Sequence, residues 1–338
     1  MNENKYDLKK IGQIALLVYI LCMAVFTVGA YNVIFQSINK ALYVGIVILG
    51  AIIIGFYFAY LQWCDKHNKK SLGIYFIRTY CKYQFLIEQL VTRDFKIKYK
   101  RSILGVFWSF LNPLLMMLVQ YFVFVTIMKF EIPHYAIYLL CGIVIFNGFN
   151  DCTTQSMRSI TGNATLITKV YVPKYIYPIS KVCSASINIL LSMAPLLLVT
   201  FVYGLFNDLY LKPSILLLPF ALITLIIFIM GMGFLLSSLM VFFHDIEFLW
   251  GVVASMWMYA TPIIYDINTI AVGKLSWVAS IIKLNPMYHY VEFVRSIIIS
   301  GTSPALSEYV ICLAYSFGMF AIGAFVFKKT QDKFVLYI

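Results

Sequence analysis

The stretch Leu90–Phe124 constrains the fold of this chain more than any other. Its first part is basic and amphipathic, and the segment Ile103–Met128 that follows carries no formal charge. A helix of about 20 apolar residues crosses the hydrocarbon core of a bilayer, and basic amphipathic helices lie at membrane surfaces. The pattern therefore predicts a helix on the cytoplasmic membrane surface that leads into a membrane-spanning helix. Five cations mark the basic part: Arg93, Lys96, Lys98, Lys100 and Arg101.

The composition extends this prediction to the whole chain. Of 338 residues, 62% are hydrophobic and 12% are charged, whereas an average soluble domain has about 25% charged residues. A soluble core could not bury so much apolar surface, so lipid must cover part of it. The net charge of +12 sits in short clusters between apolar runs. This arrangement favours the anionic cytoplasmic leaflet over a nucleic acid as the partner of the cations.

The apolar runs predict an all-α polytopic membrane protein with eight transmembrane helices. Two runs form an N-terminal hairpin with a turn over Gln36–Ala41, and six form the remaining core, which gives domains 1–70 and 71–338. Two further apolar pieces, Leu275–Leu284 and Met287–Ile299, are too short to span and are typical of re-entrant helices. The eight expected spans are Ile11–Phe35, Ala41–Trp63, Val106–Met128, Tyr135–Thr154, Val182–Gly204, Ser214–Phe243, Phe248–Ile263 and Ala305–Phe327.

The distribution of cations predicts the orientation. With the N-terminus inside and eight crossings, 20 of the 26 Lys and Arg residues lie on the cytoplasmic side. Lys40, Lys129, Lys212 and Lys274 are among the six that lie outside. This agrees with the positive-inside rule and supports the predicted topology.

Local signals mark three further features. Gly105 predicts a bend between the amphipathic stretch and the next span, and Gly231 and Gly233 predict close helix contact. The segment Asn163–Val170 is long enough for two helical turns, with Asn163 as a plausible cap. Pro173 and Pro178 bracket the end of the surrounding polar segment.

Enzymatic signals are weak. The chain lacks GxxxxGK[ST] and is not expected to bind ATP by itself. His244 and His289 each begin an H-x-x-E sequence without a third ligand nearby, so a metal site is not expected. Glu292 and Arg295 are expected to pair with each other, because charges inside a membrane need partners.

The aromatic residues, 17% of the chain, allow two interpretations. They can form interfacial belts and lipid-facing packing, or they can line a channel that stacks on sugar rings and offers hydroxyl donors. Residue type alone leaves both open. The candidate channel residues are Tyr121, Phe122, Phe124, Tyr135, Tyr138, Phe146 and Phe149.

Four ordered motifs give the chain a family resemblance over Tyr75–Phe327. The first is R-D-x-K-x-x-Y-x-x-S-x-L-G-x-x-W-x-x-x-x-P, which runs from Arg93 to Pro113. The others are Asn163–Pro178, Phe243–Tyr265 and Asn285–Pro304. The chain resembles the permeases of type-2 ABC exporters for polysaccharides, O-antigens and teichoic acids. It departs from the family pattern in its extra N-terminal hairpin and in having His244 where Arg or Lys is usual.

The resemblance implies a homodimer of permeases that carries separate cytoplasmic ATPase subunits, which bind ATP and Mg. It implies an interface helix within residues 71–101, a coupling helix over 163–174 and external gate helices within 275–299. The resemblance implies a location in the cytoplasmic membrane of a bacterium. The substrates of the family are glycans or polyol-phosphate polymers on a polyprenyl diphosphate lipid. The interface-helix residues that would meet the diphosphate are Arg93, Asp94, Lys96, Lys98, Tyr99, Lys100 and Arg101. The coupling residues are Asn163, Leu166, Ile167, Lys169, Val170, Pro173 and Lys174. The gate residues are Asn285, Pro286, Glu292 and Arg295.

Cations at a lipid interface suit a pyrophosphate head, although they would also anchor the helix to phospholipid. Two other functional classes remain open. An exporter of the same architecture could move lipids or drugs instead. A membrane-embedded glycosyltransferase would need clustered acids or histidines, whereas the 14 acidic residues are scattered.

Overall fold

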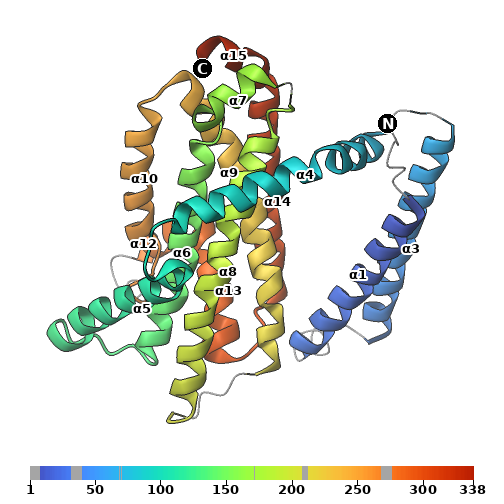
Figure 1. Ribbon diagram of the computed structural model, residues 1–338. Helices are drawn as coiled ribbons and strands as arrows, with labels where there is room; N and C mark the ends of the chain where they lie inside the picture. The colour runs from blue at the N-terminus through green and yellow to red at the C-terminus, as the bar shows by residue number, and fades with distance from the viewer. Residues whose placement is uncertain are drawn as a thin grey trace. The chain divides into compact units, whose positions relative to one another are not determined.

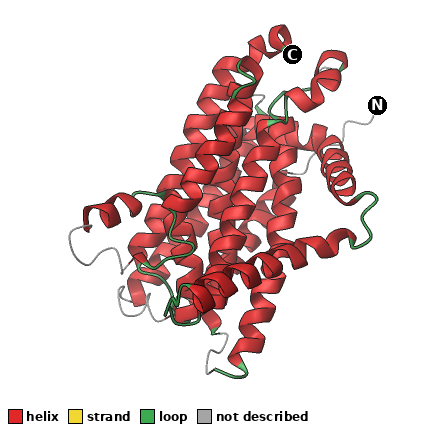
Figure 2. Cartoon of the chain, turned by 90° about the vertical axis from the view of Figure 1, so that its left-hand side faces the viewer, coloured by secondary structure: helices red, strands yellow, loops and turns green. Residues whose placement is uncertain are grey.

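The computed structural model describes residues 8–31, 40–67, 69, 71–170, 172–207, 212–267 and 276–338. Throughout these ranges the regular elements are helices (Figure 2), which confirms the predicted all-α membrane fold. They group into two compact units, residues 1–89 and residues 90–338. Helix α4 (Leu72–Tyr99) contributes to both, because the division falls within it. Most of the expected turn over Gln36–Ala41 lies outside the described ranges, as do Lys274 and Leu275.

The first unit contains α1 (Leu8–Gly29), α3 (Lys40–Lys66) and the first part of α4. Helices α1 and α3 pack against each other. The hydroxyl of Tyr19 donates to the carbonyl of Val47 at 3.2 Å, and a Cβ atom at Gly50 would lie 2.1 Å from the same hydroxyl oxygen. The tyrosine can therefore cross to α3 because Gly50 has no side chain. Asp65 pairs with Arg78 at 2.9 Å and joins α3 to α4.

The second unit is built on four long helices that run side by side (Figure 1). They are α6 (Tyr135–Met157), α8 (Ile176–Gly204), α9 (Leu218–Phe242) and α14 (Leu306–Thr330). The predicted close contact at Gly231 is confirmed, because a Cβ atom at Gly323 on α14 would lie 1.9 Å from the Gly231 carbonyl oxygen on α9. Similarly, a Cβ atom at Gly233 would meet Ser156 on α6 at 2.2 Å.

Helix α5 (Trp108–Tyr121) follows the predicted bend. Gly105 has a φ of +51°, a backbone angle that residues other than glycine rarely adopt. The short helix η1 (Gly105–Phe107) then leads into α5. Pro113 lies inside α5 and lacks the N–H that would bond the Ser109 carbonyl. The hydroxyl of Ser192 on α8 donates to that carbonyl at 3.2 Å, so α8 satisfies the acceptor that the proline leaves free. A π-helical turn, η2 (Phe122–Ile127), completes the span.

Seven helices among the described residues are long and apolar enough to cross a bilayer. The expectation of eight is therefore corrected at one position. The apolar run Phe248–Ile263 forms α10 (Ile246–Ala260), a helix of 15 residues that is only about 22 Å long. Pro262 explains the early end, because the residue before a proline is disfavoured in the helical conformation. Thr261 accordingly has extended backbone angles, with φ −94° and ψ 129°.

Short helices complete the second unit. Helices α12 (Ser276–Ile282) and α13 (Pro286–Arg295), continued by η5 (Ser296–Ser300), correspond to the two short apolar pieces. Between α6 and α8 lie η3 (Thr161–Asn163) and α7 (Ala164–Lys169). Helix α14 is followed by η6 (Gln331–Lys333) and α15 (Phe334–Tyr337). The short helix η4 (Pro213–Leu217) precedes α9. Helices α7 and α15 lie at the same end of the bundle (Figure 1).

Candidate functional site

The last turns of α4 join an ionic network with the neighbouring helices. The guanidinium of Arg93 donates to Asp94 at 2.9 Å and to the side-chain oxygen of Asn163 at 3.1 Å. The ammonium of Lys181 on α8 lies 2.9 Å from the other Asp94 oxygen. The Asp94 side chain is only 6% exposed, so its charge depends on these two cations. The network fixes the end of α4, the predicted interface helix, to α8 and to the segment before α7.

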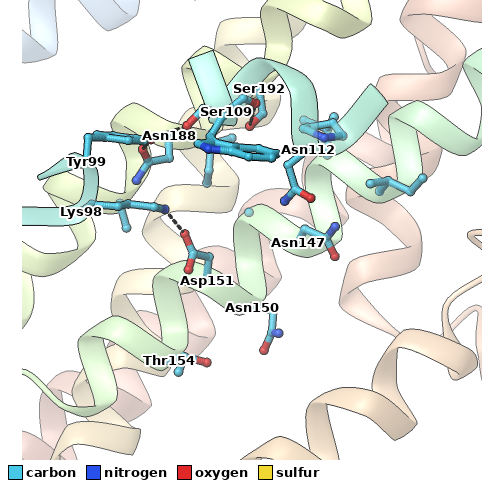
Figure 3. A pocket seen from close by; sticks show the side chains of 17 residues that line it. Lys98, Tyr99, Ser109, Asn112, Asn147, Asn150, Asp151, Thr154, Asn188 and Ser192 are labelled. Atoms are coloured by element: carbon cyan, nitrogen blue, oxygen red, sulfur yellow. Dashed lines mark hydrogen bonds and ion pairs between the residues drawn. The ribbon is translucent and has the colours of Figure 1, made fainter. Parts of the chain in front are cut away.

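The remaining cations of the interface helix divide into two groups. Lys98 forms an ion pair with Asp151 of α6 at 2.7 Å (Figure 3). Lys96, Lys100 and Arg101 are exposed, and none of them has an acidic partner within the described ranges. These three cations are thus available to an anion from outside the chain.

A cavity of about 540 Å³ lies beside the ionic network. Arg93, Lys98 and Lys181 supply three positive side chains to its wall, and Asp94 supplies one negative side chain. The excess of positive charge favours an anionic ligand there.

The end of α4 is also tied to α5. The hydroxyl of Tyr99 makes a short contact with the hydroxyl of Ser109 and donates to the side-chain oxygen of Asn188 on α8 at 2.6 Å. Because Ser192 bonds the backbone of the same serine, this junction holds α4, α5 and α8 together. Tyr99 and Pro113, which both belong to the first motif, therefore stabilise the same junction at Ser109.

The predicted coupling segment forms a shorter helix than expected. Helix α7 ends at Lys169, so Val170, Pro173 and Lys174 lie beyond it. The prediction that the Asn163 side chain caps the helix is wrong, because no side-chain capping bond forms. Instead this side chain is buried, donates to the Ser159 carbonyl at 2.7 Å and accepts from Arg93.

Helix α7 presents apolar side chains outward. Leu166 is 37% exposed and Val170 is 51% exposed, while Ile167 is half-buried and Lys169 is exposed. The ammonium of Lys174 donates to the Gln331 carbonyl at 2.6 Å and ties the segment to the end of the chain. The segment is therefore anchored to the end of the chain and exposes an apolar surface.

The predicted gate region is fixed at Asn285, the N-cap of α13. Its side-chain oxygen accepts from Met287 N at 2.9 Å and from the indole of Trp257 at 2.6 Å. Its amide donates to the Thr261 hydroxyl at 2.8 Å. Pro286 occupies the first turn of the helix, where a missing N–H costs least. The Asn-Pro pair thus starts α13 and attaches it to the end of α10.

Arg295, at the end of α13, is 3% exposed and is held mainly by backbone carbonyls. It donates to Pro262 O at 2.7 Å and to Ile263 O at 3.1 Å, and it stacks 3.4 Å above the Tyr138 ring. Glu292 lies 3.8 Å away. The predicted ion pair with Glu292 is therefore present, but it is longer than the bonds from Arg295 to the carbonyls. The arginine joins α13 to α6 and to the loop after α10.

The structure does not bring the seven candidate channel aromatics to one surface. Phe146 and Phe149 are buried at 2% and 0% exposure, and Phe149 contacts Trp257 with ring centroids 5.2 Å apart. Tyr135 and Tyr138 donate to carbonyls of the loop after α10, at 2.8 Å each. Of the three on the preceding span, Tyr121 is exposed and lies with its ring centroid 6.3 Å from that of Tyr135. Phe122 is exposed and Phe124 is half-buried.

Several polar residues of the site were not singled out from the sequence. Asp151 and Lys181 complete the ionic contacts, and Asn188 receives the tyrosine hydroxyl. The sequence feature that could have identified them is a polar side chain inside or at the end of an apolar span, where such residues are usually functional or paired. His289, which begins one of the H-x-x-E sequences, bonds Glu308 at 2.8 Å and Lys283 O at 2.8 Å. No group of three potential metal ligands occurs in the described part of the chain.

Comparison with known proteins adds an independent finding. The sequence profile of the family described as "ABC-2 type transporter" matches residues 85–299. An O-antigen export system permease protein RfbA of Klebsiella pneumoniae is 31% identical over 251 residues, which cover 74% of this chain and 93% of the relative. A second protein of that name from the same species is 30% identical over 254 residues, with the same coverage. A Myxococcus xanthus protein of that name is 26% identical over 258 residues, covering 76% of this chain and 97% of the relative.

Proposed function

The chain belongs to the ABC-2 type transporter family, and on that premise we propose that it is the permease subunit of a polysaccharide exporter. The substrate would be a polysaccharide or polyol-phosphate polymer linked to polyprenyl diphosphate, and it would cross the cytoplasmic membrane. The observation that carries the proposal is the similarity to O-antigen export permeases over 93% of the relative's length. The seven apolar helices agree with a permease.

Energy would come from a separate ATPase subunit that binds ATP and Mg. The sequence contains no GxxxxGK[ST] phosphate-binding loop, so the proposed transport needs a partner that supplies one. The exposed Leu166 and Val170 on and beside α7 support a contact in which a small apolar surface enters a groove of the partner.

The free cations of the interface helix would receive the diphosphate of the lipid carrier. Lys96, Lys100 and Arg101 are exposed at the end of the helix, and the cavity beside Arg93 and Lys98 has an excess of positive charge. Charge-assisted hydrogen bonds to phosphate are among the stronger polar contacts in proteins.

A homodimer is part of the proposal. Helix α10 carries an exposed apolar stripe at helical spacing, formed by Phe248, Val252, Met256 and Tyr259, which are 78%, 60%, 67% and 67% exposed. This helix is too short to be an ordinary lipid-facing span, so a second copy of the chain is a suitable cover for the stripe.

Deletion of the chain from its source bacterium tests the proposal. We expect lipid-linked polymer to accumulate on the cytoplasmic side, and we expect reintroduction of the chain to restore surface polymer. If the polymer were no longer made at all, the membrane-embedded glycosyltransferase would be the better interpretation. If surface polymer were unchanged, export of a lipid or drug would be favoured instead.

A further inference from the structure

A polar cavity of about 610 Å³ lies among the end of α4, α5, α6 and α8. Four asparagines from three different helices line it: Asn112 on α5, Asn147 and Asn150 on α6, and Asn188 on α8 (Figure 3). The indole of Trp108, which is 46% exposed, is also part of the wall.

Three of the four amides are free. Asn188 accepts the Tyr99 hydroxyl, whereas the side chains of Asn112, Asn147 and Asn150 make no hydrogen bond to any described residue. Figure 3 shows Asn112 and Asn147 pointing toward the same space from facing helices. Asn112 and Asn147 are exposed and Asn150 is half-buried, so these amides are open to a ligand in the cavity. Polar residues within membrane spans usually serve a function, and no contact with a described neighbouring helix accounts for these three.

We propose that this cavity binds the first sugar of the lipid-linked polymer. The inference rests on the proposed export function and assigns a place to the sugar next to the diphosphate. A free amide offers both donors and an acceptor, which suits the hydroxyl or acetamido groups of a sugar. Trp108 supplies an aromatic surface that a sugar ring can cover.

The position of Lys98 connects the two halves of the lipid head. This residue lines both the amide cavity and the positively charged cavity beside Arg93 and Lys181. Its ammonium has three donors, and Asp151 takes one of them at 2.7 Å. The remaining donors face a diphosphate in the charged cavity, and a sugar bonded to that diphosphate then reaches the amides.

The amide chemistry also argues against other ligands. A phosphate would favour the cations over neutral amides. An acyl or polyprenyl chain would leave the amide donors unsatisfied. A neutral polar ring beside an anion fits both cavities at once.

Binding to the full-length chain in nanodiscs tests this assignment. The probes are farnesyl diphosphate and its glycosylated forms carrying a single glucose or N-acetylglucosamine, with Trp fluorescence quenching as the readout. We expect at least one glycosylated probe to bind more tightly than farnesyl diphosphate. Asn112→Leu and Asn147→Leu are each expected to reduce this gain by about three- to tenfold, since each removes hydrogen bonds to the sugar. Affinity for farnesyl diphosphate itself is expected to stay unchanged.

Asn207→Leu is the matched control, because Asn207 is an exposed asparagine beyond the far end of α8. Elution as a single peak in size-exclusion chromatography checks the folding of each variant. The assignment is overturned if the glycosylated probes bind no better than farnesyl diphosphate, or if both cavity variants keep the gain; the export function would stand in either case. Binding of no probe by the wild type, together with normal surface polymer after deletion of the chain, would contradict both proposals.

Discussion

The contact between Arg93 and Asn163 makes the most specific prediction, because it joins α4 to the segment that carries α7. Asn163 is 4% exposed and bonds both Arg93 and the Ser159 carbonyl. Replacement by alanine removes both bonds and leaves the segment before α7 without its attachment to α4. We therefore expect Asn163→Ala to weaken the binding of the ATPase subunit without preventing membrane insertion.

The magnitude follows from the two bonds. A hydrogen bond to a charged group contributes about 1.5–3 kcal/mol. The Arg93 side chain is 39% exposed and keeps Asp94, so solvent and the carboxylate reduce its part to about 1 kcal/mol. The neutral bond to Ser159 adds about 1 kcal/mol. A loss of about 2 kcal/mol corresponds to a roughly 30-fold smaller population of correctly held α7.

A double-mutant cycle separates the pair from its surroundings. The affinity of the ATPase is measured for the wild type, Arg93→Gln, Asn163→Ala and the double variant, all in nanodiscs. We expect an interaction energy of about 1 kcal/mol. Thr168→Ala, on the exposed side of α7, replaces Asn163→Ala in a control cycle and should give none. Strictly additive effects for Arg93 and Asn163 would refute the idea that this contact connects the two helices.

Three further predictions concern other contacts. Leu166→Asp with Ile167→Asp should abolish co-purification of the ATPase, because charge on the apolar surface of α7 would be buried without a partner; unchanged co-purification would place the contact elsewhere. Arg295→Met should destabilise the purified protein by about 3 kcal/mol in thermal unfolding, since it leaves carbonyl acceptors unpaired; an unchanged melting temperature would show that the carbonyls find other donors. Gly323→Ala should destabilise by about 1–3 kcal/mol because α9 and α14 must separate, whereas Gly318→Ala, with no atom within 4 Å of the added Cβ, should not.

The sequence was sufficient to predict elements that the membrane itself dictates. A bilayer requires long uncharged helices, so seven spans could be placed from composition and length. Local chemistry also identified the bend at Gly105 and the close approach at Gly231, because only glycine suits these positions. Asn285 and Pro286 could be placed in the gate region by resemblance, and their capping role follows from helix geometry.

Other features depend on contacts between distant residues and could not be predicted. The early end of α10 depends on the conformation imposed by Pro262, which an apolar count overlooks. Asn163 matches a helix cap in sequence, yet Arg93, which is 70 residues away, provides a stronger partner. The amide cavity combines residues from α5, α6 and α8, and only the packing of these helices brings them together.

The most direct test of the account is reconstituted transport. The permease and its ATPase are placed in proteoliposomes with a lipid-linked polysaccharide that carries a label on its sugars, and protection of the label from an external glycosidase is followed over time. We predict protection only when both subunits and hydrolysable ATP are present, and no ATP turnover by the permease alone. Protection by the permease without its partner, or ATP turnover by the isolated chain, would contradict the central claim.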